Sequence, residues 1–157
     1  MKHPTYFDAV DHQALLRAFP VGPSFIENRT KLSRDELRAL QDTQFRSCIS
    51  RAWGIPFYRR LWSKCGLEPG DINGIADISN LPTYDKTDIM RSVEAYPPFG
   101  DFHGMESFGE TPESRPPVIL HTTSGTTGTP QPLLFGPKSR EVQNILMARA
   151  FVLQGLG

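Results

Sequence analysis

The segment His121–Pro130, HTTSGTTGTP, is the most informative stretch of the chain. Five of the six residues from Thr122 to Thr127 carry a hydroxyl group. Gly125 and Gly128 allow the backbone to adopt positive φ angles. Consecutive backbone N–H groups in such a loop can turn toward one point and form a concave site for an anion. The segment therefore predicts a loop that holds phosphate.

Other loop signatures fit this segment less well. The chain contains no Gly-Lys pair, which excludes a Walker A loop. Thr122 stands two residues before Ser124, where a nucleophile elbow requires Gly. His121 precedes Ser124 by three residues, but no acidic residue has a placement that would orient it as a base. Composition alone leaves a solvated linker open as an alternative.

Short apolar runs on both sides of the loop predict strands. They are Pro117–His121, PVILH, and Gln131–Phe135, QPLLF, and Pro132 limits the second to an edge strand or a short strand. The apolar positions of Lys138–Gln154 then predict a helix. Because a lone pair of strands is marginally stable in water, we expect another segment or chain to complete this sheet.

Helices are predicted to precede the strands. Ser33 and Glu36 have the spacing of a capping box, and apolar residues repeat at helical spacing from Leu37 to Trp53. Two further helices are predicted over Pro56–Cys65 and Thr83–Val93.

The first part of the chain has many Pro and Gly residues and no sustained period. Residues 1–32 are therefore predicted to be a mostly irregular lead-in, with a short helix over Asp11–Phe19. Residues 33–157 are predicted to form one α/β domain, with a helical layer followed by the first strands of a sheet.

Composition excludes several classes of function. The 157 residues include 17 basic and 17 acidic side chains, so the basic excess of a general nucleic-acid binder is absent. No apolar run approaches the roughly 18 residues that a membrane span requires, and the N-terminus does not resemble a signal peptide. Neither Cys48 and Cys65 nor the four His residues have metal-ligand spacing. We therefore expect no metal site, and reduced core thiols in a cytoplasmic protein.

Several aromatic and basic side chains could either have a structural role or bind a substrate or nucleotide. An aromatic group at helical spacing is predicted to pack in the core rather than line a substrate pocket: Trp53, Phe57, Tyr58 and Trp62. Arg59 and Arg60 are predicted to solvate an exposed helical face.

The string TSGTTGTP, Thr123–Pro130, resembles the phosphate-binding signature of the adenylate-forming superfamily of acyl-CoA ligases, adenylation domains and luciferases. Further stretches resemble its phenylacetate–CoA ligase-like branch. Ile55–Arg59, IPFYR, is similar to V-P-F-Y-R, and Leu81–Asp88 is similar to L-P-x-x-x-K-x-D. His121 stands where that branch has His before S-S-G-T-T-G, and the resemblance covers residues 33–157.

This resemblance implies an ATP-dependent, two-step reaction. A carboxylate attacks the α-phosphate of Mg-ATP to give an acyl-adenylate, and a thiol, usually coenzyme A, then displaces AMP. The resemblance assigns phosphate binding to the loop residues Thr123, Ser124, Gly125, Thr126, Thr127 and Gly128. It also makes His121 a candidate for nucleotide or acyl binding, with a purely structural role beside the loop as the alternative. Gln131 occupies a position that is Lys in many members but commonly not in this branch.

The resemblance implies only the N-terminal portion of such a ligase. The family's magnesium-binding Glu motif, its ribose-binding Asp and its C-terminal Lys do not occur within these 157 residues, so we assign no catalytic residue. The expected partners are ATP, Mg²⁺, coenzyme A and a small aryl or other carboxylic acid, together with a second copy or a missing C-terminal half. The alternatives are a non-catalytic remnant that binds nucleotide or a partner, and a plain structural domain.

Overall fold

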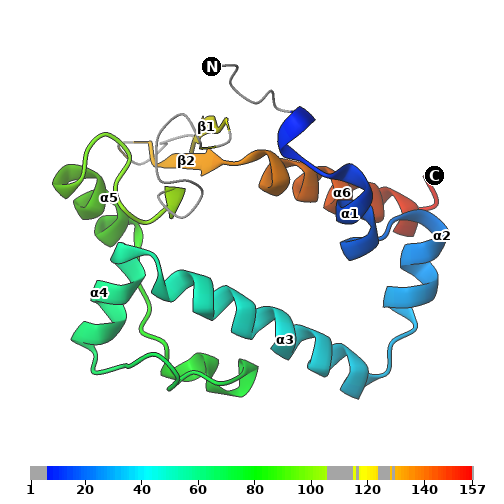
Figure 1. Cartoon of the computed structure of the whole chain (residues 1–157), viewed down its shortest axis with the longest axis horizontal. Coiled ribbons are helices and arrows are strands. Elements are labelled where there is room, and N and C mark those ends of the chain that lie inside the picture. Colours follow the sequence, from blue (N-terminus) through cyan, green and yellow to red (C-terminus); the bar gives the residue numbers. More distant parts are fainter. Residues whose placement is uncertain (1–6, 106–114, 116, 124–127, 129, 157) are drawn as a thin grey trace.

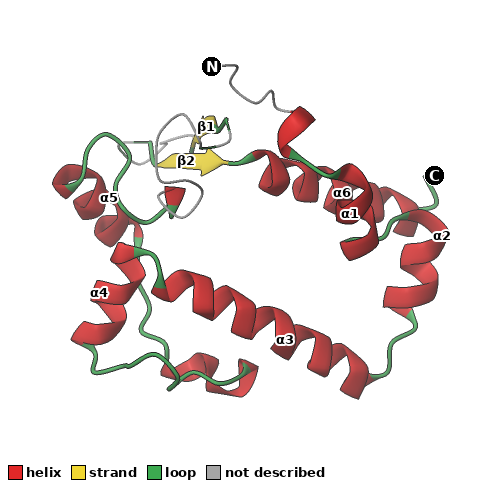
Figure 2. Ribbon diagram, viewed as in Figure 1, coloured by secondary structure: helices red, strands yellow, loops and turns green. Residues whose placement is uncertain are grey.

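The computed structural model describes residues 7–105, 115, 117–123, 128 and 130–156. In this part of the chain most of the structure is helical, and one antiparallel pair of short strands lies between α5 and α6 at one edge of the view (Figure 1; Figure 2). The helical elements are η1 (Phe7–Ala9), α1 (His12–Ala18), α2 (Gly22–Phe25), η2 (Ile26–Thr30), α3 (Arg34–Trp53), α4 (Pro56–Lys64), η3 (Ile75–Asn80), α5 (Lys86–Ala95) and α6 (Pro137–Leu153). The strands are β1 (Ile119–Thr122) and β2 (Pro132–Phe135).

The first 30 residues hold more helix than the sequence predicts. The short helix expected there is confirmed as α1, which begins where the Asp11 carboxylate accepts a hydrogen bond from the Ala14 N–H at 2.9 Å. The expectation of a mostly irregular lead-in is wrong, because α2 and the π-helical turn η2 follow directly. Neither has a side-chain N-cap; α2 packs against α6, and η2 packs against α2.

A first hydrophobic core joins the two ends of the described chain. Val10, Leu15 from α1 and Ile145 from α6 are buried together, and three partly buried side chains cover them: Phe19, Val21 and Val142. Arg149 of α6 donates from Nε to the Pro20 carbonyl oxygen at 2.9 Å. This core therefore fixes α1 and α2 against the helix that follows the strands (Figure 1).

A second core lies between α3, α4 and the segment after them. The capping box that starts α3 is confirmed: the Ser33 N–H donates to Glu36 Oε2 at 2.8 Å, and the Glu36 N–H donates to Ser33 Oγ at 3.3 Å. The buried side chains of this core are Ile49, Trp62 and Ile72. Hydrogen bonds from the Ser33 hydroxyl, and then from its backbone N–H, lower the pKa of the Glu36 carboxyl.

The aromatic side chains of α3 and α4 pack as predicted. The rings of Trp53 and Trp62 meet edge to face with centroids 5.1 Å apart, and the buried Phe57 ring makes edge contacts with Tyr58 and Tyr84. Burial and the neighbouring Tyr84 hydroxyl raise the pKa of Tyr58. These contacts support a packing role for the group.

The two cysteines correct the prediction of core thiols. Cys48 and Cys65 are both free, and both are exposed. Cys48 lies beside the buried Ile49 but on the outer face of α3, and Cys65 is the C-cap residue that follows α4. Helical spacing placed Cys48 among the apolar positions, although only one side of α3 is covered.

Arg60 is fixed in position instead of only solvating α4. Its guanidinium forms a forked ion pair with the buried Asp101, in which Nη2 lies 2.9 Å from Oδ1 and Nη1 contacts Oδ2. The Ser92 hydroxyl of α5 donates to Asp101 Oδ1 at 2.8 Å, and the Asp101 N–H donates back to Ser92 Oγ at 3.0 Å. Arg60 is therefore part of a link between α4, α5 and the segment after α5.

The sheet has the two strands that the sequence predicts. They are antiparallel, with Ile119 opposite Phe135 and Thr122 opposite Pro132, and α6 follows β2 after Gly136. The limits of the strands and of α6 agree with the predictions to within two residues, whereas α5 begins three residues later than predicted, at Lys86. None of the helices in the described ranges is both long enough and apolar enough to cross a membrane.

Candidate functional site

The strands β1 and β2 carry the two ends of the Ser/Thr/Gly loop. The Thr123 N–H donates to the Gln131 carbonyl oxygen at 3.1 Å, and the Gln131 N–H donates to Thr123 Oγ1 at 3.0 Å. This pair continues the ladder one step past Thr122 and Pro132. These two hydrogen bonds hold the two ends of the loop together. We call the bonded pair Thr123 and Gln131 the closed neck of the loop.

Only some of the predicted loop residues lie in the described part of the structure. Ser124, Gly125, Thr126 and Thr127 lie outside the described residues, so their predicted contacts with phosphate are not observed. Gly128 is exposed and has a φ of 148°, a region that side chains other than hydrogen rarely allow. Its conformation agrees with the use of Gly for backbone freedom in this loop.

His121 lies on β1 with one ring nitrogen in an unusual environment. Its ring meets the Phe135 ring of β2 edge to face, with centroids 5.2 Å apart and an interplanar angle of 81°. Its Nε2 atom is buried and has no hydrogen-bond partner among the described residues. A buried polar atom without a partner costs free energy, so this atom is available to a group that the described structure does not hold.

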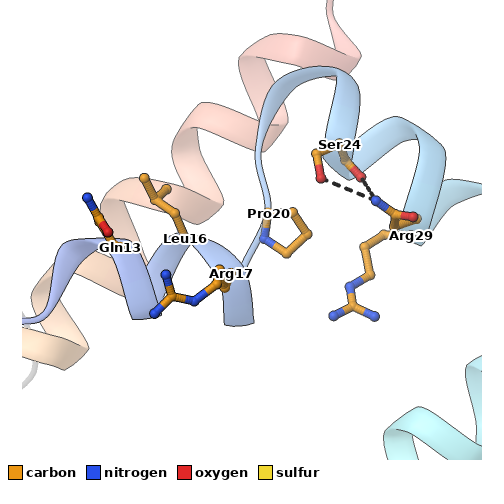
Figure 3. Close-up of a pocket in the computed structure, with 7 residues that line it drawn as sticks. Gln13, Leu16, Arg17, Pro20, Ser24 and Arg29 are labelled. Carbon is orange, nitrogen blue, oxygen red and sulfur yellow. Dashed lines mark hydrogen bonds between the residues drawn. The ribbon is translucent and has the colours of Figure 1, made fainter.

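An open groove on the other side of the structure is a second concave feature. It lies along α1, α2 and η2, away from the strands, and seven residues line it: Gln13, Leu16, Arg17, Pro20, Ser24, Asn28 and Arg29 (Figure 3). The lining contains two guanidinium groups and no carboxylate. Sequence reasoning missed this groove, because the helical turns that bring its residues together were predicted to be irregular chain.

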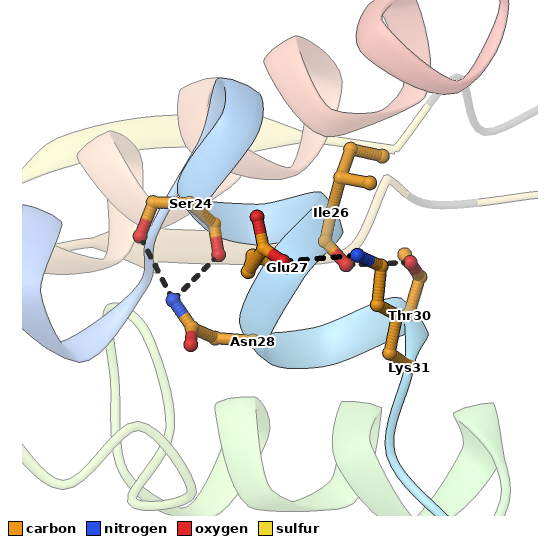
Figure 4. A network of polar contacts seen from close by, with 6 residues as sticks. All are labelled: Ser24, Ile26, Glu27, Asn28, Thr30 and Lys31. Atoms are coloured by element: carbon orange, nitrogen blue, oxygen red, sulfur yellow. Dashed lines mark hydrogen bonds and ion pairs between the residues drawn. The ribbon is translucent and has the colours of Figure 1, made fainter.

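Several polar groups of α2, η2 and the residue after η2 have partners within this continuous helical segment. The Asn28 side-chain amide donates to the Ser24 carbonyl oxygen at 2.9 Å and to Ser24 Oγ at 3.2 Å. Lys31 pairs with Glu27 at 2.9 Å, and the Thr30 hydroxyl donates to a backbone carbonyl in the turn before it (Figure 4). These contacts stabilise η2, and they assign no chemistry to the groove.

Within the described ranges, no three His, Cys, Asp or Glu residues gather closely enough to hold a metal ion. The structure therefore assigns no Mg²⁺ ligand.

Comparison with known proteins relates the chain to one group of enzymes. No protein-family model matches it. It is 30% identical over 126 residues to the phenylacetate–coenzyme A ligase of Thermus thermophilus, covering 79% of this chain and 25% of that enzyme. It is 29% identical over 134 residues to the phenylacetate–coenzyme A ligase of Aromatoleum evansii, covering 85% of this chain and 28% of that enzyme. The chain thus spans about a quarter of the length of these relatives.

The fold points to the same group. A crystal structure of 2-hydroxyisobutyryl-CoA ligase with 2-HIB-AMP and CoA, in the thioesterification state, matches with a TM-score of 0.64 and 29% identity. That match covers 77% of this chain and 24% of the ligase. An open conformation of the ligase, also with 2-HIB-AMP and CoA, matches with a TM-score of 0.63 and 26% identity. In sequence and in fold, the chain corresponds to the N-terminal portion of the phenylacetate–CoA ligase-like branch of the adenylate-forming superfamily.

Proposed function

We propose that this chain is part of an ATP-dependent acid–thiol ligase, in which the loop from Thr123 to Gly128 grips the phosphates of ATP. The reaction would form an acyl-adenylate from an aryl or other small carboxylate, and then an acyl-CoA. The relatives are phenylacetate–CoA ligases, and the solved neighbours hold an acyl-AMP and CoA. These likenesses support the class of reaction.

The closed neck of the loop is the observation that carries the proposal. A hydroxyl- and Gly-rich loop binds phosphate well only if its ends are held together, because otherwise the ligand must order the whole segment. The paired hydrogen bonds between Thr123 and Gln131 hold the ends in this way. Backbone N–H groups of such a loop then stabilise the negative charge that develops on the pyrophosphate leaving group.

The roles of the remaining groups follow from their positions. The buried Nε2 atom of His121 would form a hydrogen bond with the nucleotide, with the acyl group or with the loop itself. Gln131 adds no positive charge beside the loop, so Mg²⁺ bound with ATP supplies most of the charge neutralisation. We assign no residue of this chain to the Mg²⁺ ion, to coenzyme A or to the carboxylate.

Carboxylate-dependent exchange of labelled pyrophosphate into ATP tests this function. The chain is assayed with a panel of aryl and short aliphatic acids, beside the variant Thr126→Ala/Thr127→Ala. Mg-ATP is expected to raise the melting temperature of the wild-type chain and to have a smaller effect on the variant, since a ligand of the native state stabilises it by mass action.

The possible results distinguish between the functions that the loop could have. Exchange that the variant loses would show that the chain forms an acyl-adenylate without a further segment. A thermal shift without exchange would support phosphate binding by one part of a larger ligase. The absence of both would reject the proposal and leave the loop as a solvated turn.

His121→Phe is expected to separate folding from binding. Phe can keep the edge contact with Phe135, and it removes the buried nitrogen that has no hydrogen-bond partner within the described part of the chain. The melting temperature without ligand should therefore stay the same or rise, because an unsatisfied buried polar atom costs about 1–3 kcal/mol. The shift produced by Mg-ATP should become smaller, and scanning calorimetry with and without Mg-ATP checks both effects. An unchanged Mg-ATP shift would assign His121 a purely structural role.

We further expect the isolated chain to self-associate through exposed apolar side chains of β1 and α6. Leu120 of β1 is 51% exposed and Met147 of α6 is 57% exposed, and among the described residues each strand is paired along one edge only. The variant Leu120→Lys/Met147→Lys should shift sedimentation velocity profiles toward monomer. Ile78→Lys on η3, where Ile78 is 55% exposed, is the matched control and should not. A wild-type chain that stays monomeric as its concentration rises would contradict this expectation.

A further inference from the structure

The backbone beyond the loop offers a single hydrogen-bond donor at the neck. Gln131 lies between Pro130 and Pro132, and neither proline has a backbone N–H. Its N–H is thus the only main-chain donor among residues 130–132, and it points to the Thr123 side chain at 3.0 Å. On the Gln131 side of the loop, the hydrogen bond that holds the two ends together therefore depends on a single acceptor.

That acceptor is a hydroxyl group where a regular ladder would use a carbonyl oxygen. In a hydrogen-bonded antiparallel pair, each residue donates its N–H to the carbonyl oxygen of the other. Thr123 and Gln131 make one such bond, from the Thr123 N–H to the Gln131 carbonyl oxygen at 3.1 Å. The return bond from Gln131 ends on Thr123 Oγ1 instead. The Thr123 hydroxyl therefore takes the place of its own carbonyl group as the acceptor.

We propose that Thr123 is a positioning residue, whose hydroxyl fixes the two ends of the loop by accepting the Gln131 N–H, and that it acts on phosphate through this bond. The inference rests on the proposed nucleotide site. Thr123 is half-buried, as is Gln131, so water replaces the lost bond poorly if the hydroxyl is removed. A loop with an open neck must then be ordered by the ligand, at a cost in affinity.

Three substitutions test the role of this hydroxyl. Thr123→Val keeps the shape of the side chain and removes the acceptor, and Thr123→Ser keeps the acceptor. Thr122→Val is the matched control, because Thr122 is the exposed neighbour on β1. Hydrogen exchange of the Gln131 amide is measured by NMR in the chain without ligand, and the Mg-ATP dissociation constant is measured by calorimetry.

We expect the Gln131 amide exchange rate and the Mg-ATP dissociation constant to change together. Thr123→Val should speed Gln131 amide exchange and raise the Mg-ATP dissociation constant by about fivefold to tenfold, the usual effect of one hydrogen bond. Thr123→Ser and Thr122→Val should match the wild-type chain in both measurements. Since Ser restores only the hydroxyl, its rescue would separate the hydrogen bond from side-chain packing.

Other outcomes would overturn the inference in recognisable ways. If Thr123→Val raises the Mg-ATP dissociation constant while hydrogen exchange of the Gln131 amide stays unchanged, Thr123 is a direct phosphate ligand. Unchanged binding in Thr123→Val would remove Thr123 from the site while the proposed function stands. A wild-type chain that does not bind Mg-ATP would reject the proposed function, and the positioning role with it, before any variant is compared.

Discussion

Asp101→Ala is expected to lower the free energy of unfolding by about 2–3 kcal/mol, less than the full loss of a buried ion pair because Arg60 is half-exposed. The Asp101 carboxylate accepts two hydrogen bonds from the Arg60 guanidinium of α4 and one from the Ser92 hydroxyl of α5. Its removal leaves the Ser92 hydroxyl buried without its acceptor. It also leaves Arg60 with its contact over the Tyr96 ring, 4.9 Å from the centroid, in place of the ion pair.

Urea denaturation followed by tryptophan fluorescence measures this effect, because both tryptophans lie on α3 and α4. Asp101→Asn retains one oxygen acceptor and should lose about half as much stability, since it keeps neutral hydrogen bonds in place of charged ones. Arg59→Ala changes the exposed neighbour of Arg60 on the same helix and should stay within about 0.5 kcal/mol of the wild-type chain. An Asp101→Ala variant as stable as Arg59→Ala would contradict the structural role of this link.

The same carboxylate predicts how stability changes with pH. Burial raises the pKa of Asp101, but hydrogen bonds from Arg60 and Ser92 outweigh it and hold the pKa below its ordinary value. The unfolded chain therefore binds the proton first, at a pKa of about 3.9, and the contribution of Asp101 to stability is complete above that range. It is lost as the pH falls through the lower pKa of the folded state. The stability difference between wild type and Asp101→Asn should stay constant above about pH 5 and shrink as the pH falls below about 3.9.

Local signals in the sequence were sufficient for the helices and strands that begin or end at a distinctive residue. Ser33 with Glu36 predicted the start of α3, and a similar local signal starts α5, where the Asp85 carboxylate accepts from the Thr87 and Asp88 N–H groups. Each of these signals acts within one turn of helix, so the sequence order alone carries it. The two strands were predictable for a similar reason, because their apolar runs are bounded by loop residues.

Features that depend on distant residues were not predictable in this way. The partner of Arg60 lies 41 positions along the chain, and nothing near Arg60 distinguishes it from the exposed Arg59. The helical turns α2 and η2 lack side-chain caps, and α2 packs against α6, more than 100 residues later, while η2 packs against α2. The sequence predicted the phosphate loop by type, whereas the use of the Thr123 hydroxyl as the acceptor at its neck required the strand register.

The two hydrophobic cores give rise to the second large prediction. One core contains Leu15 with Ile145, and the other contains Ile49 with Trp62. The chain has only two tryptophans, and both belong to the second core or pack against it. Tryptophan fluorescence therefore reports on the second core, while circular dichroism reports on the helices of both.

Ile49→Ala and Leu15→Ala are each expected to cost about 2–4 kcal/mol, because each removes a buried aliphatic side chain and leaves a cavity. The helices of the first core pack mainly with one another, as do those of the second, so we expect the two cores to unfold separately. Ile49→Ala should move the urea midpoint seen by fluorescence. Leu15→Ala should leave that midpoint in place and lower the midpoint of an earlier step in the circular dichroism signal.

The two variants serve as controls for each other, since both shorten a buried aliphatic side chain to Ala. Equal shifts of the fluorescence midpoint in both would mean that the chain unfolds as one cooperative unit, and would contradict separate unfolding. Separate unfolding has a consequence for the loop, because α6 follows β2 directly and belongs to the first core. Leu15→Ala should then weaken the Mg-ATP response of the proposed site, while Ile49→Ala should affect that response less.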